Sequence, residues 1–178
     1  LTAQKAGGMV EFWNHGWDHK QWADGAKKVS EFGGSGYAHQ KEHFAKAQEA
    51  MEKVLGAAPV GFGTPFNSFD ADTSRVVGED PRIRLVFCYK APQIKGVVPA
   101  LMSLRGEPDG TGKPNAAKFA EEYAKKKGQV TFAAIQFHPA AFRDAHLEEY
   151  DKTLDILLAD GWTFMLPSEY VARVAKKE

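Results

Sequence analysis

Two histidines stand four residues apart in the sequence HGWDH at residues 15–19. At this spacing both imidazoles lie on one face of a helical turn, where they can bind one metal ion. The alternative is that one ring packs and the other is exposed. Asn14 and Asp18 are placed to orient the two imidazoles from outside the ligand set.

A second pair with the same spacing, His39 and His43, shows that spacing alone does not identify a metal site. This pair encloses Lys41 and Glu42 in a stretch rich in charged and amide side chains. Such a composition predicts the solvated face of a helix. The context of each pair must therefore distinguish them.

His138 follows the apolar run at residues 130–137. Imidazole titrates near neutral pH, so a histidine at a strand end can act as a general acid or base. The alternative is a structural histidine with its hydrogen bonds satisfied. The turn at residues 62–67 also follows an expected strand, where a backbone N–H group could line a pocket.

Strands and helices that alternate along the chain must position these residues. We expect helices near 38–55, 72–77, 115–127 and 145–159, with Ser168 capping a last short helix. We expect strands at 9–13, 60–62, 84–89, 130–137 and 162–166, a loop at 21–36, and an apolar stretch of open type at 95–104. This order predicts a mainly parallel sheet or a (β/α) barrel. The pair His15 and His19 and the single His138 would then each follow a strand.

The composition is that of an ordinary soluble globular protein, and 178 residues fit a single domain, 1–178. Lys and Arg total 23, as do Asp and Glu, so a zero net charge argues against nucleic acid as a partner. No apolar run approaches the roughly 20 residues of a membrane span. No signal-peptide pattern is visible, which leaves the localisation open. Cys88, the only cysteine, lies in an apolar run and is expected to be buried.

Four ordered segments resemble the polysaccharide deacetylase superfamily, the NodB-like proteins of carbohydrate esterase family 4. The family's Asn-His-Ser/Thr-x-x-His segment is similar to NHGWDH at residues 14–19, and its Arg-Pro-Pro-Tyr-like segment to FGTPFN at residues 62–67. Its late strand ending in histidine is similar to IQFH at 135–138, and its closing segment to GWTFMLPSE at 161–169.

The resemblance implies metal-dependent hydrolysis that removes acetyl groups from a carbohydrate. In that family a divalent ion, usually zinc, is held by two histidines and an aspartate, and it polarises the acetyl carbonyl and activates water. Carried over to this chain, the resemblance gives His15 and His19 as metal ligands. It gives His138 as the general acid that protonates the leaving amine. Expected carbohydrate contacts are Trp17, Tyr37, Pro65, Phe66 and Asn67.

Two departures from the family pattern stand out. The family has an Asp-Asp segment at the end of its first strand, but no aspartate precedes His15 here, so the third ligand and the base are missing. Gly63 stands where an arginine usually supports the base. We therefore expect a distorted (β/α) barrel that lacks its N-terminal strand–helix unit. Its open sheet edge would be left incomplete or closed by another copy in a homo-oligomer.

A non-catalytic carbohydrate-binding relative is an alternative that the missing acids support. Trp13, Trp17, Trp22 and Tyr37 could stack on sugar rings, although core packing is the simpler interpretation for Trp13.

A polysaccharide lyase on the same scaffold is a further alternative. His138 or Tyr37 would then serve as the base. Arg82, Arg84 and Arg105 could hold a uronate carboxylate, although ordinary surface roles are expected for these arginines.

Overall fold

The structure is a computed structural model that describes residues 7–8 and 10–176. It is an α/β fold that divides into two compact units. The first unit comprises Leu1–Ala100 with Met165–Glu178, and the second comprises Leu101–Phe164. The expectation of one catalytic domain over residues 1–178 stays a prediction.

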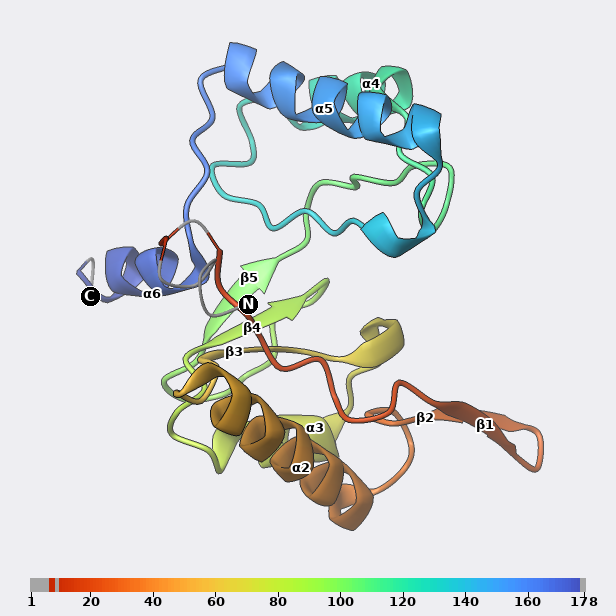
Figure 1. Ribbon diagram of the computed structural model, residues 1–178, viewed down its shortest axis with the longest axis vertical. Coiled ribbons are helices and arrows are strands. Elements are labelled where there is room, and N and C mark those ends of the chain that lie inside the picture. Colours follow the sequence, from red (N-terminus) through yellow and green to blue (C-terminus); the bar gives the residue numbers. More distant parts are fainter. Residues whose placement is uncertain (1–6, 9, 177–178) are drawn as a thin grey trace. The chain divides into compact units, whose positions relative to one another are not determined.

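A three-stranded sheet in the order β3-β4-β5 forms the centre of the first unit (Figure 1). Its strands are β3 (Gly61–Gly63), β4 (Leu85–Cys88) and β5 (Val98–Leu101), and β3 runs parallel to β4. Asn14 forms a parallel bridge to Phe62, donating its N–H to Gly61 and accepting from Gly63. Of the strand expected at 9–13, residues 10–13 are irregular and Met9 lies outside the described residues. The chain thus joins the sheet one residue before His15.

Two helices pack with this sheet around a shared apolar core. They are α2 (Tyr37–Leu55), which ends at the left-handed residue Gly56, and α3 (Ala71–Gly78). The core cluster consists of Phe32, Phe44, Phe62, Val76, Val77, Ile83, Val86 and Cys88. Asp70, rather than the expected Asp72, caps α3 by accepting the Thr73 N–H group. Asp70 lies three residues before Thr73, and this spacing lets its carboxylate reach the Thr73 amide.

The stretch at 21–36 begins with a β-hairpin, so the expectation of a loop throughout is wrong. Strands β1 (Gln21–Asp24) and β2 (Lys27–Ser30) pair antiparallel. The two-residue turn is Gly25-Ala26, and Gly25 has the positive φ of 59° that the first position of such a turn requires. Helix α6 (Pro167–Ala175) also belongs to this unit, and its N-cap is Leu166, not Ser168. Ser168 instead donates to the carboxylate of Glu11.

The second unit is built on α4 (Ala116–Lys126) and α5 (Asp144–Ala159), with the short η2 turn (Pro139–Ala141) before α5. As expected, Asn115 caps α4 by accepting the Lys118 N–H group. Leu104, Phe119, Tyr123 and Leu157 form its core.

Two expected strands are not formed, at 130–137 and at 162–166. Side chains of the first segment, among them Ala133 and Ile135, pack against the core of the second unit. Ala134 donates its N–H group to the Leu101 carbonyl at 2.8 Å, but residues 130–137 form no strand ladder. Apolar burial is therefore achieved there without strand pairing. The strands of the described residues form no closed barrel, so the barrel-like architecture stays a prediction.

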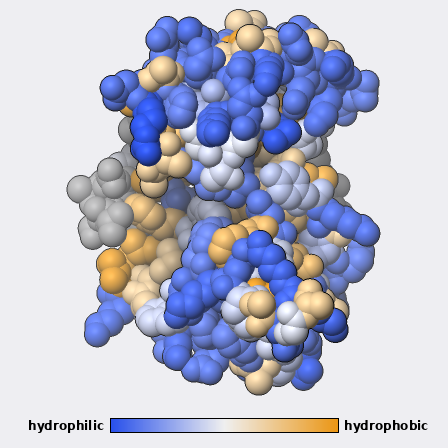
Figure 2. Space-filling view, turned by 90° about the vertical axis from the view of Figure 1, so that its right-hand side faces the viewer, coloured by the Kyte–Doolittle hydropathy of each residue, from blue (hydrophilic) through white to orange (hydrophobic). Residues whose placement is uncertain are grey.

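The surface gives no sign of a membrane span. Among residues 7–8 and 10–176, no helix is long and apolar enough to cross a membrane. Figure 2 shows a mainly hydrophilic face that is interrupted by small apolar areas. The expected homo-oligomer stays a prediction.

Candidate metal-ligand loop

Residues 15–19 form a loop wrapped around a buried carboxylate, not the helical turn that the spacing suggested. The Glu31 side chain, from the residue after β2, is fully buried. Its Oε1 accepts the backbone N–H groups of Trp17 at 2.5 Å and Asp18 at 3.3 Å, and its Oε2 accepts that of His19 at 2.9 Å. These three bonds satisfy backbone N–H groups of the loop that form no helix or sheet hydrogen bonds.

Gly16 allows the loop to approach this carboxylate closely. Its φ is +85°, and a Cβ atom there would lie 2.6 Å from Glu31 Oε2. Both the backbone conformation and the contact distance therefore call for glycine at this position. His19 also has a positive φ, 53°, which is uncommon for a residue with a side chain.

Asn14 fixes the beginning of the loop from inside the protein. Its buried side-chain amide donates to Gln48 Oε1 at 3.0 Å and to the Phe44 carbonyl at 3.3 Å. Its Oδ1 accepts the Gly16 N–H group at 2.9 Å. The prediction that Asn14 orients an imidazole is therefore wrong, because its hydrogen bonds go to the loop backbone and to α2.

The His15 ring is oriented by a backbone carbonyl at the end of β3. Its Nδ1 lies 2.8 Å from the Gly63 oxygen, which can only accept, so Nδ1 carries the proton. This tautomer places the lone pair on Nε2, the atom that can ligate a metal. A second nitrogen held by a carbonyl is the usual support of a metal-binding histidine.

His15 and His19 lie close enough to share one ion. Their ring centroids are 5.2 Å apart. Two imidazoles on a tetrahedral zinc ion, with Zn–N bonds of about 2.0–2.1 Å, hold their ring centres about 5 Å apart. The pair therefore fits two ligand positions of a zinc-type ion.

The remaining ligands are not supplied by the described part of the chain. Across residues 7–8 and 10–176, the one group of three close His, Cys, Asp or Glu donors is Asp18, Glu31 and His43, without His15 or His19. Among those residues no acidic donor joins His15 and His19 in a group of three, and the third ligand stays unassigned.

The prediction that His39 and His43 form a solvated helix face is wrong. Their rings stack with centroids 3.9 Å apart, and the Nε2 atom of His39 is buried. His43 Nδ1 lies 3.1 Å from Glu31 Oε1 and 3.8 Å from Asp18 Oδ1. Burial of His39, reinforced by the nearby His43, lowers the pKa of the His39 imidazole. No local sequence pattern indicates these contacts, since Glu31 lies in a polar stretch of loop-like composition.

Asp18 forms an ion pair rather than orienting an imidazole of the ligand pair. Its carboxylate lies 3.0 Å from the Lys20 ammonium. Burial alone would raise the pKa of Asp18, but the hydrogen bond and charge of Lys20, together with His43, hold that pKa below its usual value.

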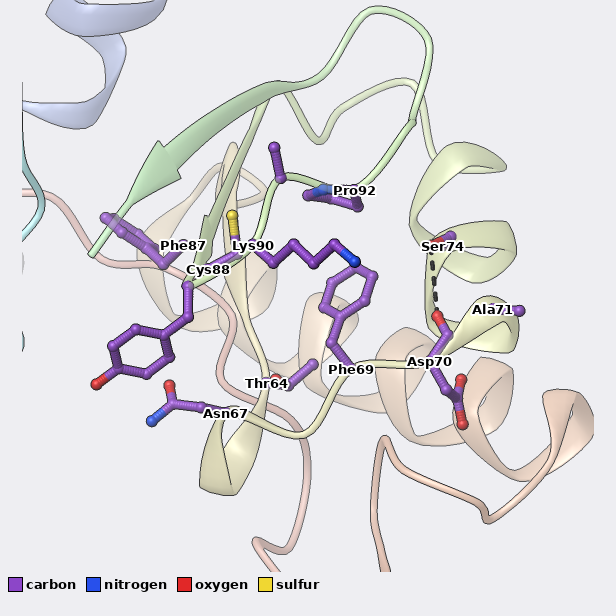
Figure 3. Close-up of a pocket in the computed structure, with 12 residues that line it drawn as sticks. Thr64, Asn67, Phe69, Asp70, Ala71, Ser74, Phe87, Cys88, Lys90 and Pro92 are labelled. Carbon is purple, nitrogen blue, oxygen red and sulfur yellow. Dashed lines mark hydrogen bonds between the residues drawn. The ribbon is translucent and has the colours of Figure 1, made fainter. Parts of the chain in front are cut away.

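A cavity of about 420 Å³ opens at the carboxyl ends of β3 and β4 (Figure 3). Thr64 and Asn67 line it after β3, and Lys90 lines it after β4. Asn67 is therefore at a cavity wall, as a substrate contact would need to be. Pro65 is buried and begins the 3-10 turn η1 (Pro65–Asn67).

Phe66 links this turn to the histidine loop. Its ring centroid lies 4.3 Å from that of His19, and its side chain is 43% exposed. Phe66 and Asn67 have φ values of 59° and 53°, in the left-handed region that costs most side chains about 1–2 kcal/mol. Strain of this kind concentrates at functional sites.

The other expected carbohydrate contacts have contrasting surroundings. Trp17 is 50% exposed on the loop between the two histidines, so its indole is accessible to a ligand. Tyr37 is engaged in a polar cluster with α3, because its hydroxyl donates to Glu79 at 2.6 Å and Arg75 lies 3.9 Å above its ring. Of the arginines considered for uronate binding, Arg82 is paired with Asp80 and Glu52, whereas Arg84 and Arg105 are exposed.

His138 lies in the second unit beside Glu107. The nearly buried Glu107 carboxylate accepts the His138 backbone N–H at 2.6 Å, and its other oxygen lies 2.6 Å from Nδ1. The ring is 40% exposed. A carboxylate at Nδ1 fixes the tautomer and leaves Nε2 to exchange protons, as in carboxylate–histidine pairs of hydrolases. Sequence inspection did not single out Glu107, which lies in a Gly- and Pro-rich stretch.

Comparison with known proteins supports the resemblance over the first part of the chain. Residues 1–81 match the family model for polysaccharide deacetylases. No curated protein gave a significant match. Over residues 1–81 the chain therefore resembles the polysaccharide deacetylases.

Solved structures of the family share the fold at low sequence identity. A family 4 pseudoenzyme from Bacillus anthracis has 12% identity and a TM-score of 0.59, over 89% of this chain and 45% of its own. A family 4 acetyl xylan esterase from Clostridium thermocellum, solved with a cobalt ion, has 16% identity and a TM-score of 0.55, over 88% and 61%.

The peptidoglycan deacetylase PdaC from Bacillus subtilis is similar to the same extent. It has 14% identity and a TM-score of 0.56, over 92% of this chain and 64% of its own. The chain therefore spans between about half and two thirds of the length of these proteins, and the similarity establishes the fold.

Proposed function

We propose that this protein is a metal-dependent hydrolase that removes acetyl groups from a carbohydrate, at an N-acetyl or O-acetyl position. One observation carries the proposal. His15 and His19 lie with ring centroids 5.2 Å apart beside the end of β3, and a backbone carbonyl holds Nδ1 of the first. This arrangement suits two histidine ligands of a divalent ion, zinc being the usual one.

Metal binding, sugar binding and proton transfer are assigned to different side chains. His15 and His19 hold the ion, which when bound supplies a Lewis acid for the acetyl carbonyl and an activated water. Trp17 and Phe66, both exposed beside the pair, offer aromatic faces to a sugar ring. His138, with Nδ1 held by Glu107, carries the proton destined for the leaving group on Nε2.

The proposal is tested by metal binding and turnover measured together. Purified protein should take up close to one equivalent of zinc or cobalt, and His15→Ala should lose it. The protein should also release acetate from acetylated xylan or from N-acetylglucosamine oligomers. Failure to bind metal at saturating zinc would contradict the proposal.

A second candidate is a carbohydrate-binding relative without activity. The observation that favours it is the missing third donor, since no acidic side chain of the described residues joins His15 and His19 in a group of three. The similarity to a pseudoenzyme shows that this fold also occurs in a protein described as inactive. Sugar binding that Trp17→Ala weakens, without any acetate release, would support this candidate.

A further inference from the structure

The Glu31 side chain controls the shape of the loop at residues 15–19. It is fully buried, and its two oxygens accept three consecutive backbone N–H groups, those of Trp17, Asp18 and His19. Hydrogen bonds to a charged acceptor are roughly twice as strong as neutral ones. The loop has no helical or sheet hydrogen bonds of its own, so these bonds define its conformation.

The carboxylate is itself held from the opposite side. His43 Nδ1, on α2, lies 3.1 Å from Glu31 Oε1. Oε1 thus contacts the Trp17 and Asp18 amides and His43, while Oε2 accepts the His19 amide. The same four contacts explain why a buried charge is tolerated here.

We propose that Glu31 is the positioning residue of the metal site, and that it sets His15 and His19 at their mutual distance through the loop backbone. This inference rests on the proposed function, in which the two histidines are ligands. Glu31 acts on the histidines through the loop backbone, because both of its oxygens accept loop amides. The group of three donors, Asp18, Glu31 and His43, therefore supports the site.

The test compares Glu31→Gln with Glu49→Gln, an exposed glutamate on α2. Glutamine keeps the shape of the side chain but replaces one acceptor oxygen with an N–H donor that faces the loop amides. Loss of an outer-shell partner of this kind costs about 10- to 100-fold in metal affinity. We expect the Kd for zinc and for cobalt to rise by that factor in Glu31→Gln, with an altered visible band of bound cobalt. In Glu49→Gln we expect no change.

Amide hydrogen exchange provides a readout that does not depend on metal. The amides of Trp17, Asp18 and His19 should be protected in the wild type and should exchange at least about 10-fold faster in Glu31→Gln. If the wild type binds no metal, the proposed function fails, while faster exchange in the variant still supports control of the loop by Glu31. Unchanged exchange together with unchanged affinity would overturn the inference.

Two further results would bear on where the ion binds and on the role of Glu31. Metal binding that survives His15→Ala but is lost in His43→Ala would place the ion among Asp18, Glu31 and His43, and would overturn the positioning role. If Glu31→Gln does not fold, judged by circular dichroism, Gly16→Ala asks the same question from the loop side. Its added methyl would push on Glu31 Oε2, so a weaker metal affinity there supports the inference and an unchanged affinity overturns it.

Discussion

His15 Nδ1 and the carbonyl oxygen of Gly63 are 2.8 Å apart, which joins the ligand loop to the end of β3. The resemblance to the family pattern predicts an arginine at position 63, where this chain has glycine. The space into which a side chain would project is taken by Trp13, because a Cβ atom on Gly63 would lie 2.6 Å from Trp13 Cζ3. This chain therefore has an indole and a backbone carbonyl where the family pattern has an arginine side chain.

Restoring the arginine should harm the protein. We expect Gly63→Arg to lower the free energy of unfolding by about 1–3 kcal/mol, since the side chain must displace the Trp13 ring. Urea denaturation measures the change. The double variant Trp13→Ala/Gly63→Arg should lose less stability than the sum of the losses in the two single variants. Equal stability of Gly63→Arg and the wild type would contradict this account.

Gly16 and Gly25 form a matched pair that separates backbone strain from collision. Both have positive φ, but only a Cβ at Gly16 meets a neighbour, whereas nothing lies within 4 Å of one at Gly25. We expect Gly25→Ala to cost about 1–2 kcal/mol of stability. Gly16→Ala should cost more and should also weaken zinc binding. Thermal denaturation and zinc titration of both variants provide the comparison, and equal losses would argue against the close contact with Glu31.

The helices of this fold were predictable because their side chains repeat regularly. The expected ranges of α2, α4 and α5 agree with the structure to within about one residue. Apolar runs were less informative. Residues 84–89 contain β4, whereas residues 130–137 form no strand, because an apolar run indicates burial but does not provide a neighbouring strand for hydrogen bonding.

The histidine segment was predicted from its position after residues 9–13 and from the family resemblance, whereas its supporting residues were not predicted. Gly63, Glu31 and Glu107 act across 48, 12 and 31 residues of sequence on His15, His19 and His138. Such contacts depend on the tertiary fold, and a single sequence does not encode them as a local pattern. His43 was misassigned for the same reason.

His138 and Glu107 should separate catalysis from metal binding. We expect His138→Ala to reduce acetate release by about 100- to 10,000-fold, as is typical when a general acid is removed, and to leave zinc affinity unchanged. Glu107→Gln should reduce it less, because the imidazole remains but loses its charged partner at Nδ1. Acetate assays and zinc titrations of both variants test the assignment. Full activity of His138→Ala would exclude His138 as the general acid.

Glu79 should make the packing of α2 on α3 sensitive to acid. The Tyr37 hydroxyl, followed by the Lys41 ammonium, lowers the pKa of Glu79 to about 2 from 4.5. A lowered carboxyl pKa stabilises the folded state above the unfolded-state pKa, and this contribution is lost as the pH falls from about 4.5 to about 2. We expect Tyr37→Phe to move the Glu79 pKa upward toward 4.5, measured by an NMR titration. An unchanged pKa would show that the hydroxyl has no such influence.

The dependence of the histidine loop on Glu31, Asn14 and Gly63 sets the size of the smallest transferable unit. A peptide containing only residues 15–19 would carry both imidazoles but none of the groups that hold them. Grafting the site onto another scaffold would require Asn14 to His43, the β3 segment that supplies the Gly63 carbonyl, and Gln48, which anchors the Asn14 amide. The ligand pair is thus a property of a folded substructure.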